Sequence, residues 1–202
     1  MPVYALDGRV PVLDPSAFLH PQAVLIGDVI VGPRCYIGPG ASLRGDFGRI
    51  QVGAGANVQD GCVLHTFPGQ QTLLEEDSHV GHRAVLHGCT VRRGALIGIG
   101  AIVMDDAVIE AEAFVGAASF VPARTVVPAR TLALGVPARV VRALTAEEIA
   151  WKARGTREYQ DLAARCLRTL SECAPLTAAE PERPRFSASD LAPLHTLPRP
   201  AD

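Results

Sequence analysis

A six-residue repeat runs through the middle of the chain and restricts the fold more than any other feature. Aliphatic residues recur at every sixth position, and a small residue precedes most of them by two positions. An α-helix repeats near 3.6 residues and a plain strand at 2, so neither accounts for a period of six. The aliphatic series is Val85, Val91, Ile97, Val103, Ile109, Val115, Val121 and Val127, and the small series is Cys89, Ala95, Ala101, Ala107, Ala113, Ser119 and Thr125.

This period predicts an all-β parallel β-helix. In such a solenoid each hexapeptide forms one short strand and a turn, the aliphatic residue points into the prism, and the small residue lets the turn pass the next coil. Three hexapeptides then make one triangular coil. We predict a lead-in and cap over residues 1–23 and the β-helix over 24–143. The earlier part of the aliphatic series is Leu25, Val31, Ile37 and Leu43, and it resumes at Val52, Val58 and Leu64.

Two breaks interrupt the repeat, between Leu43 and Val52 and between Leu64 and Val85. A break in a solenoid usually expels a loop on one face, and such faces often bind ligands. The two interruptions also hold most of the polar side chains of this part of the chain. They are therefore the first places to look for chemistry.

A helix is predicted after the repeat, over residues 144–173. Thr145 and Glu148 match the capping box, in which the two side chains satisfy each other's backbone N–H groups. An apolar stripe suited to packing along the prism then follows. From residue 174 to 202 the chain is rich in Pro and polar residues without a period, and we expect it to be extended or disordered. The stripe comprises Tyr159, Leu162, Ala163, Cys166, Leu167 and Leu170.

The charge and the chain start exclude several classes of partner. A formal net charge of −2 with no basic cluster argues against binding to nucleic acid or to a membrane. The start lacks a positive leader and an apolar core, so we expect a cytoplasmic protein. Five cysteines without C-x-x-C spacing favour free thiols, and Cys35, Cys62 and Cys89 lie on the small-residue track as packing residues.

Four of the six histidines lie within residues 65–87. Three imidazoles with an open position form the coordination of a catalytic zinc that activates water. His82 and His87 are five residues apart and should fall on neighbouring faces of the prism. One chain cannot easily aim both at one ion, whereas two neighbours in a homotrimer can.

The alternative, which spacing alone leaves open, is that these histidines satisfy turn hydrogen bonds or face solvent. For His20 and His195, which lie outside the cluster, this alternative is preferred.

Several motifs together resemble the γ-class carbonic anhydrase family of left-handed β-helix proteins. They are RGDFGRI at 44–50, NVQD at 57–60, His65, and HVGHRAVLHGC at 79–89. The segment EEIAWKARGTREYQDLAARC at 147–166 is similar to a subgroup of phenylacetate-degradation proteins. The resemblance covers about residues 1–175.

The resemblance implies a homotrimer with zinc or ferrous iron bound by His65 and His87 of one subunit and by His82 of its neighbour, and it leaves His79 as structural. A carboxylate paired with arginine across a desolvated interface can be bidentate. The resemblance also implies that Arg44 and Asp60 form an ion pair between subunits and that Asp46 organises this network. It implies that Gln59, with Asn57 beside it, hydrogen-bonds to water at the metal, and that Tyr159 approaches the site.

A metal of this kind activates water for attack on carbon dioxide or on the carbonyl of a CoA thioester. The subgroup resemblance implies hydrolysis of thioesters that arise as dead-end products of phenylacetate breakdown. Phe47 stands where the founding pattern of the family has an acidic residue. Efficient proton transfer then depends on a substitute among Glu75, Glu76 and Asp77, which favours thioester hydrolysis over carbon dioxide hydration.

Two other functions fit a hexapeptide-repeat chain. One is an acyltransferase that uses acyl-CoA and a catalytic histidine without metal. The other is a scaffold that keeps the fold and lacks catalysis. Neither G-x-G-x-x-G nor a Walker A motif occurs in the sequence, so the mode of CoA binding cannot be read from it.

Overall fold

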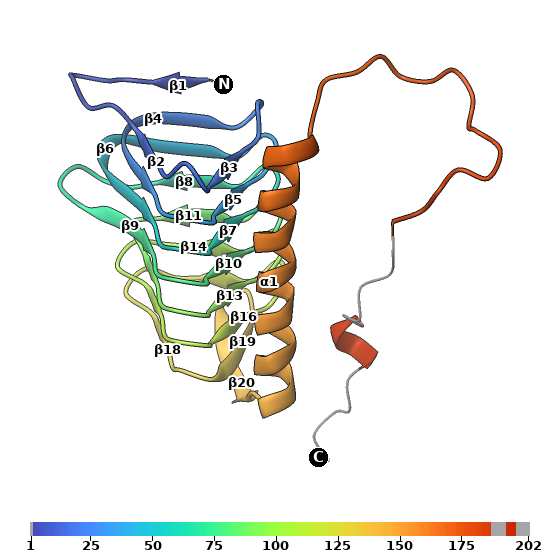
Figure 1. The fold of residues 1–202 in the computed structure, drawn as a ribbon. Helices are drawn as coiled ribbons and strands as arrows, with labels where there is room; N and C mark the ends of the chain where they lie inside the picture. The colour runs from blue at the N-terminus through green and yellow to red at the C-terminus, as the bar shows by residue number, and fades with distance from the viewer. Residues whose placement is uncertain (1, 187–192, 197–202) are drawn as a thin grey trace.

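A computed structural model describes residues 2–186 and 193–196. The chain winds into a left-handed parallel β-helix of about seven turns, and one long helix runs along one face of it (Figure 1). This is the fold class predicted from the repeat. Within the described residues, no helix is long and apolar enough to cross a membrane.

Most strands are two residues long, as a hexapeptide that also contains a turn requires. The strands are β1 (Val3–Tyr4), β2 (Val12–Leu13), β3 (Phe18–Leu19), β4 (Val24–Val31), β5 (Tyr36–Ile37), β6 (Ser42–Val52), β7 (Asn57–Val58), β8 (Val63–His65), β9 (Gln71–Leu74), β10 (His79–Val80), β11 (Val85–His87), β12 (Thr90–Val91), β13 (Leu96–Ile97), β14 (Ile102–Val103), β15 (Val108–Ile109), β16 (Phe114–Val115), β17 (Phe120–Val121), β18 (Val126–Val127), β19 (Thr131–Gly135) and β20 (Ala138–Ala143).

The strands stack into two sheets. One sheet has the order β20-β19-β16-β13-β10-β7-β5-β3, and every pair in it is parallel except β19 with β20. The second sheet covers the other two faces of the prism, because β6 continues round an edge. Ser42 and Leu43 of β6 pair with β8, and residues 49–52 of the same strand pair with β9. The first break in the repeat is therefore a strand that turns a corner.

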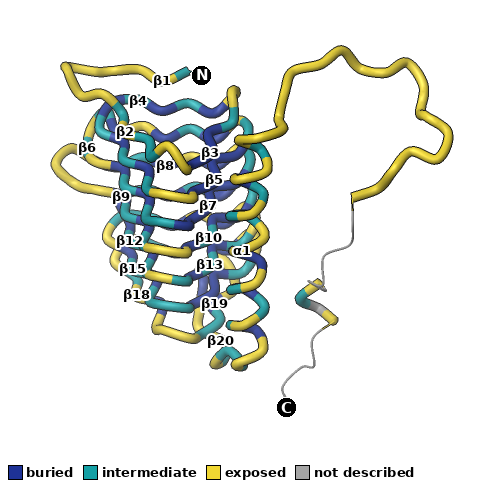
Figure 2. The backbone as a smooth tube through the Cα atoms, in the orientation of Figure 1, coloured by how far each residue is buried: buried dark blue, intermediate teal, exposed yellow. Residues whose placement is uncertain are grey.

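The two tracks of the repeat form the core that the sequence predicts (Figure 2). Aliphatic side chains such as Ile97 and Val115 have no exposed surface, and the alanines two positions earlier are equally buried. One member of the predicted track is wrong. Leu86, and not Val85, is fully buried, because the turn through His87 and Gly88 shortens the step to Val91 from six residues to five.

Left-handed backbone in the turns gives each coil its corners. Arg83, Glu112, Ala118 and Arg124 all have φ between 55° and 61° at the second turn position. Glycine occupies the same position at Gly94, where this conformation is easily adopted.

The first 23 residues take part in the solenoid and are more than a lead-in. β1 and β2 pair with β4, and β3 pairs with β5 in the helix-covered sheet. At the other end, the antiparallel hairpin of β19 and β20 closes the stack.

Helix α1 (Ala146–Thr169) begins with the predicted capping box. The Glu148 N–H donates to Thr145 Oγ1 at 3.1 Å, and the Thr145 N–H donates to Glu148 Oε2 at 2.9 Å. Arg142 holds the same carboxylate with two hydrogen bonds of 2.6 and 2.8 Å. These contacts anchor the start of the helix to β20.

The apolar stripe of α1 is shorter than predicted. Ala163 is buried against Phe18 and Tyr36, with Tyr159, Leu162 and Cys166 packed around them. Leu167 and Leu170 are about half exposed, because the helix there has passed the last strands that it covers. Residues 174–186 form neither strand nor helix, and the short 3-10 helix η1 (Leu194–Thr196) follows. The rest of the predicted tail lies outside the described residues.

The three cysteines on the small-residue track are buried free thiols. Burial raises the pKa of Cys35 and of Cys89 to about 12 and that of Cys62 to about 11. Thiolates are the reactive form of cysteine, so these residues serve packing, as the sequence predicts.

Candidate metal centre

His65 and His87 lie side by side on the surface of the prism. They are the last residues of β8 and β11, and the parallel register places them directly opposite each other. The Nδ1 atom of His65 lies 3.1 Å from Nε2 of His87. The stacking of β8 on β11 thus brings together two histidines that are 22 residues apart in the sequence.

A carboxylate holds the outer nitrogen of each of these rings. His65 Nε2 is 2.9 Å from Asp46 Oδ1, and His87 Nδ1 is 2.6 Å from Asp105 Oδ1. A carboxylate accepts hydrogen bonds, so each ring donates an N–H outward. When both rings are neutral, the two inner nitrogens face each other with their lone pairs.

This pair fits a metal ion such as zinc or ferrous iron. Histidine nitrogens bind zinc at about 2.0–2.1 Å, and two such bonds at a tetrahedral ion place the nitrogens about 3.3 Å apart. The observed 3.1 Å is close to that separation. The carboxylates supply the outer hydrogen bonds that fix the tautomer of metal-binding histidines.

Sequence reasoning missed Asp105. It follows His87 by 18 residues, the usual length of one coil, and lies one residue beyond the position that the local register, Leu86 with Val103, would align with the histidine. Gly88 keeps the path open, because a Cβ atom there would collide with the Asp105 carboxylate. The period of the coil could have identified this partner.

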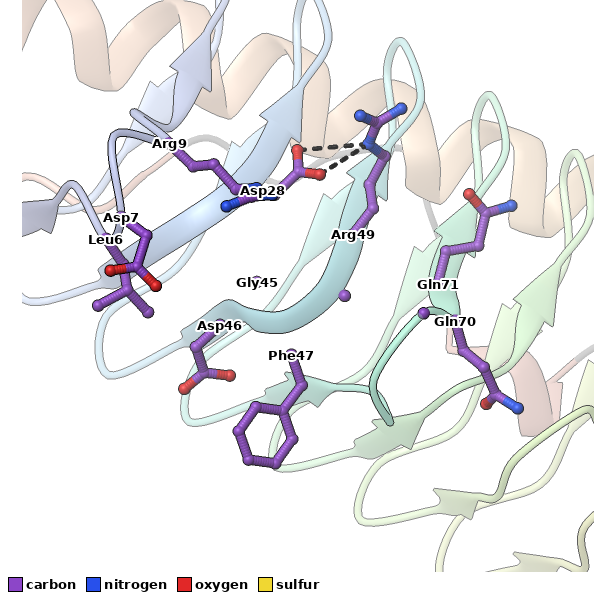
Figure 3. Close-up of a pocket in the computed structure, with 12 residues that line it drawn as sticks. Leu6, Asp7, Arg9, Asp28, Gly45, Asp46, Phe47, Arg49, Gln70 and Gln71 are labelled. Carbon is purple, nitrogen blue, oxygen red and sulfur yellow. Dashed lines mark hydrogen bonds and ion pairs between the residues drawn. The ribbon is translucent and has the colours of Figure 1, made fainter.

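Two exposed phenylalanines border the histidine pair. The Phe47 ring lies 5.3 Å from His65 and the Phe67 ring 5.0 Å from His87 between centroids. Asp46 and Phe47 also line a cavity of about 630 Å³ that extends to the Asp28–Arg49 ion pair (Figure 3). The cavity thus reaches Asp46, the carboxylate partner of His65, while the two imidazole side chains themselves are only 12% and 22% exposed.

His82 lies elsewhere on the same chain. Its Nδ1 is 2.8 Å from Asp60 Oδ2, and its side chain is 41% exposed. It lies in the turn before β11, whereas His87 ends that strand, and each of the two rings has a different carboxylate partner. Among the residues that the structure describes, no group of three or more potential ligands in this single chain could hold a metal.

Asn57 and Gln59 are buried beside His79 under α1. Gln59 Nε2 donates to Asn57 Oδ1 at 3.0 Å and lies 2.6 Å from His79 Nε2, while Asn57 Nδ2 is 3.2 Å from His79 Nδ1. Burial lowers the pKa of His79 to about 3, so the ring is neutral. Tyr159 packs edge-on against it at 5.3 Å. These residues belong to the side of the chain that carries His82.

Arg44 and Asp60 make separate contacts within the chain. Arg44 Nη1 lies 3.0 Å from Asp46 Oδ2, and Asp60 holds His82. An ion pair between Arg44 of one subunit and Asp60 of another stays a prediction.

Two of the predicted proton-transfer residues, Glu75 and Asp77, have partners other than histidine. Glu75 pairs with Arg92 at 2.6 Å, and Asp77 accepts from Gln160 at 2.9 Å. The remaining histidine that can be described, His20, accepts a turn hydrogen bond from the Gln22 N–H. The side chain of His195 lies outside the described residues. Each of the three predicted ligands thus has a carboxylate partner, and among residues 2–186 and 193–196 no carboxylate pairs with His20 or His79.

Comparison with known proteins defines the family. The chain is 53% identical over 194 residues to the carnitine operon protein CaiE of Salmonella dublin and of Salmonella typhimurium, with 96% of this chain and 98% of each relative covered. The chain belongs to the CaiE family of hexapeptide-repeat proteins. No protein-family model matches the chain.

Solved structures share the CaiE-type fold. A proposed acetyltransferase of Bacillus cereus is 38% identical with a TM-score of 0.80, over 81% of this chain and 95% of that one. A hexapeptide transferase family protein of Anaplasma phagocytophilum is 36% identical with a TM-score of 0.78, over 80% and 96%. The relatives named above carry the CaiE name and not that of the phenylacetate-degradation protein PaaY, so the narrower resemblance stays a prediction.

Proposed function

We propose that this CaiE-family protein is a metal-dependent enzyme of a homotrimer, with zinc or ferrous iron bound by His65 and His87 of one subunit and His82 of the next. The observation that carries the proposal is the carboxylate partner of each of these three histidines, at 2.6 to 2.9 Å. Such partners orient metal-binding imidazoles and raise their basicity. The 3.1 Å approach of the two inner nitrogens supports the same conclusion.

The trimer is supported by an apolar ladder beside the histidine pair. Val63, Val85, Ile102 and Phe120 stack in register on the outer face of β8, β11, β14 and β17. Val63 and Ile102 are 38% exposed in the single chain. A neighbouring subunit that covers this ladder would bring its own His82 towards His65 and His87 without any change of fold.

We propose that the reaction is hydrolysis of a CoA thioester, with carbon dioxide hydration as a lesser activity. A metal ion held by three neutral imidazoles supplies a Lewis acid that lowers the pKa of water towards about 7. The residues of this chain would hold the metal-binding rings in place and orient the substrate. Asp46, Asp60 and Asp105 would fix the three rings, and Gln59, whose Nε2 contacts Asn57 and His79, has its Oε1 left to accept a hydrogen bond.

In the part of the chain that the structure describes, Glu75 pairs with Arg92 and Asp77 accepts from Gln160, and neither contacts a histidine, which favours the thioester reaction. Carbon dioxide hydration at high rate needs a proton-transfer group near the metal, and Phe47 and Phe67 stand beside the histidines instead. Phenylacetate breakdown as the source of the thioester rests on the sequence resemblance alone.

The test is to load the purified protein with zinc or with iron and assay it against carbon dioxide and a panel of aryl-CoA thioesters. We expect stoichiometric metal, measurable thioester hydrolysis, and loss of both in His87→Ala. An active protein without bound metal would contradict the proposal.

A second candidate is acyl transfer, which the solved transferase-family structures at 36% and 38% identity favour. An acyltransferase would release free CoA only when an acceptor amine or alcohol is present, and chelation of metal would leave its rate unchanged. The same assay with and without acceptor and chelator separates the two reactions.

A further inference from the structure

A cavity of about 560 Å³ lies between α1 and the outer face of the eight-stranded sheet. Leu96, Phe114 and Leu132 line it from β13, β16 and β19. Trp151 and Tyr159 line it from the helix. Its volume is in the range of small-molecule sites, about 300–1,000 Å³.

The cavity reaches the side of the chain that carries the third predicted metal ligand. Gln59, His79 and His82 form part of its lining, beside the exposed side chain of Ile99. His82 Nδ1 is occupied by Asp60, which leaves Nε2 as the free nitrogen of that ring. A molecule in the cavity would therefore extend from an apolar interior towards a polar end.

The lining selects against charged ligands. Within the described chain no Lys or Arg lines the cavity, so phosphate groups find no counter-charge there. Its ionisable groups are His82 at the polar end, His79, Tyr159 and the carboxylate of Glu158. Burial keeps His79 and Tyr159 uncharged, since it lowers the pKa of His79 to about 3 and raises that of Tyr159 to about 12.

We propose that this cavity binds the apolar acyl group of the thioester substrate, with the thioester carbonyl at the end formed by Gln59 and His82. The inference rests on the proposed function, which it deepens by naming an uncharged, apolar acyl group as the specificity element. The CoA moiety then stays outside the cavity. Ala117, an exposed turn residue in the lining, controls its width at the rim.

The experiment measures binding and is independent of turnover. The metal-loaded protein is titrated with S-ethyl-, S-butyl- and S-hexyl-CoA, thioethers that cannot be hydrolysed. We expect affinity to increase by about fourfold for each buried methylene. Equal affinity for all three thioethers would overturn the proposal, even if the enzyme hydrolyses thioesters. A chain-length dependence without any hydrolysis would leave the cavity assigned and remove the proposed reaction.

A matched pair of variants locates the effect. Ala117→Trp should weaken S-hexyl-CoA at least tenfold and leave S-ethyl-CoA unchanged. Ala123→Trp is the control, because Ala123 is exposed at the same position of the next turn and is outside the cavity lining. Both turns have a left-handed second residue, Ala118 and Arg124. Equal weakening by the two variants would contradict the placement of the acyl group.

Discussion

The Nδ1 atom of His65 lies 3.1 Å from Nε2 of His87, and a carboxylate accepts from the opposite nitrogen of each ring. Strand register alone brings these two rings together, and the third predicted ligand, His82, lies on another part of the chain.

Asp105 should control metal affinity through His87. Asp105→Asn weakens the acceptor that fixes the ring, and loss of such a partner typically costs about 10- to 100-fold in affinity. A competition titration with a chelator measures the change. The neighbouring Asp106→Asn is the control, since Asp106 is exposed and contacts neither histidine. If both variants bind metal like the wild type, Asp105 does not orient the ligand.

Leu86 should contribute more to the free energy of unfolding than Val85, although the six-residue repeat places Val85 in the core. Leu86→Ala creates a cavity in the prism, and such changes lower the free energy of unfolding by about 2–5 kcal/mol. Val85→Ala leaves no cavity inside the prism and affects only the outer apolar ladder, so it should cost less than Leu86→Ala. Chemical denaturation at one fixed protein concentration compares them. A larger loss in Val85→Ala would show that the register is wrong.

Lys152 should make the stability of the fold rise with pH. Burial lowers the pKa of Lys152 to about 7, against the opposing attraction of Asp77 and Glu112, and its ammonium group donates to the Asp77 carbonyl. Between pH 7 and about 10 the unfolded chain binds the proton that the folded chain has released, so unfolding becomes less favourable as pH rises.

The measurement is the melting temperature of wild type and Lys152→Met at pH 7, 8 and 9. The wild type should gain stability relative to the variant at each step, by at most about 1.4 kcal/mol per pH unit. Parallel curves for the two proteins would show that Lys152 remains charged in the folded state.

The repeat predicted the coil, the core tracks and the free thiols because each depends on local spacing. It failed at Val85, where a five-residue step brings Leu86 inward, since one residue more or less in a turn leaves no trace in composition. It also failed at Leu167 and Leu170, because the extent of the sheet beneath α1 cannot be read from the helix itself.

The three-histidine metal site stays a prediction. The choice of His65, His82 and His87 came from a family resemblance, and the structure adds a carboxylate partner for each of them. Asp105 was accessible from the 18-residue coil period and was missed. The cavity under α1 was not predictable, because it depends on how a helix distant in sequence packs on the sheet.

Mixed trimers test the shared metal site most directly. His82→Ala and His87→Ala chains, each with its own affinity tag, are produced separately and together, and metal content and thioester hydrolysis are measured. Each variant alone should lack both. Each trimer that contains both chains should regain one of its three sites, about a third of the wild-type number, because one subunit then supplies His65 and His87 and the next supplies His82. Full metal content in His82→Ala alone, or no recovery in mixed trimers, would contradict a site shared between subunits.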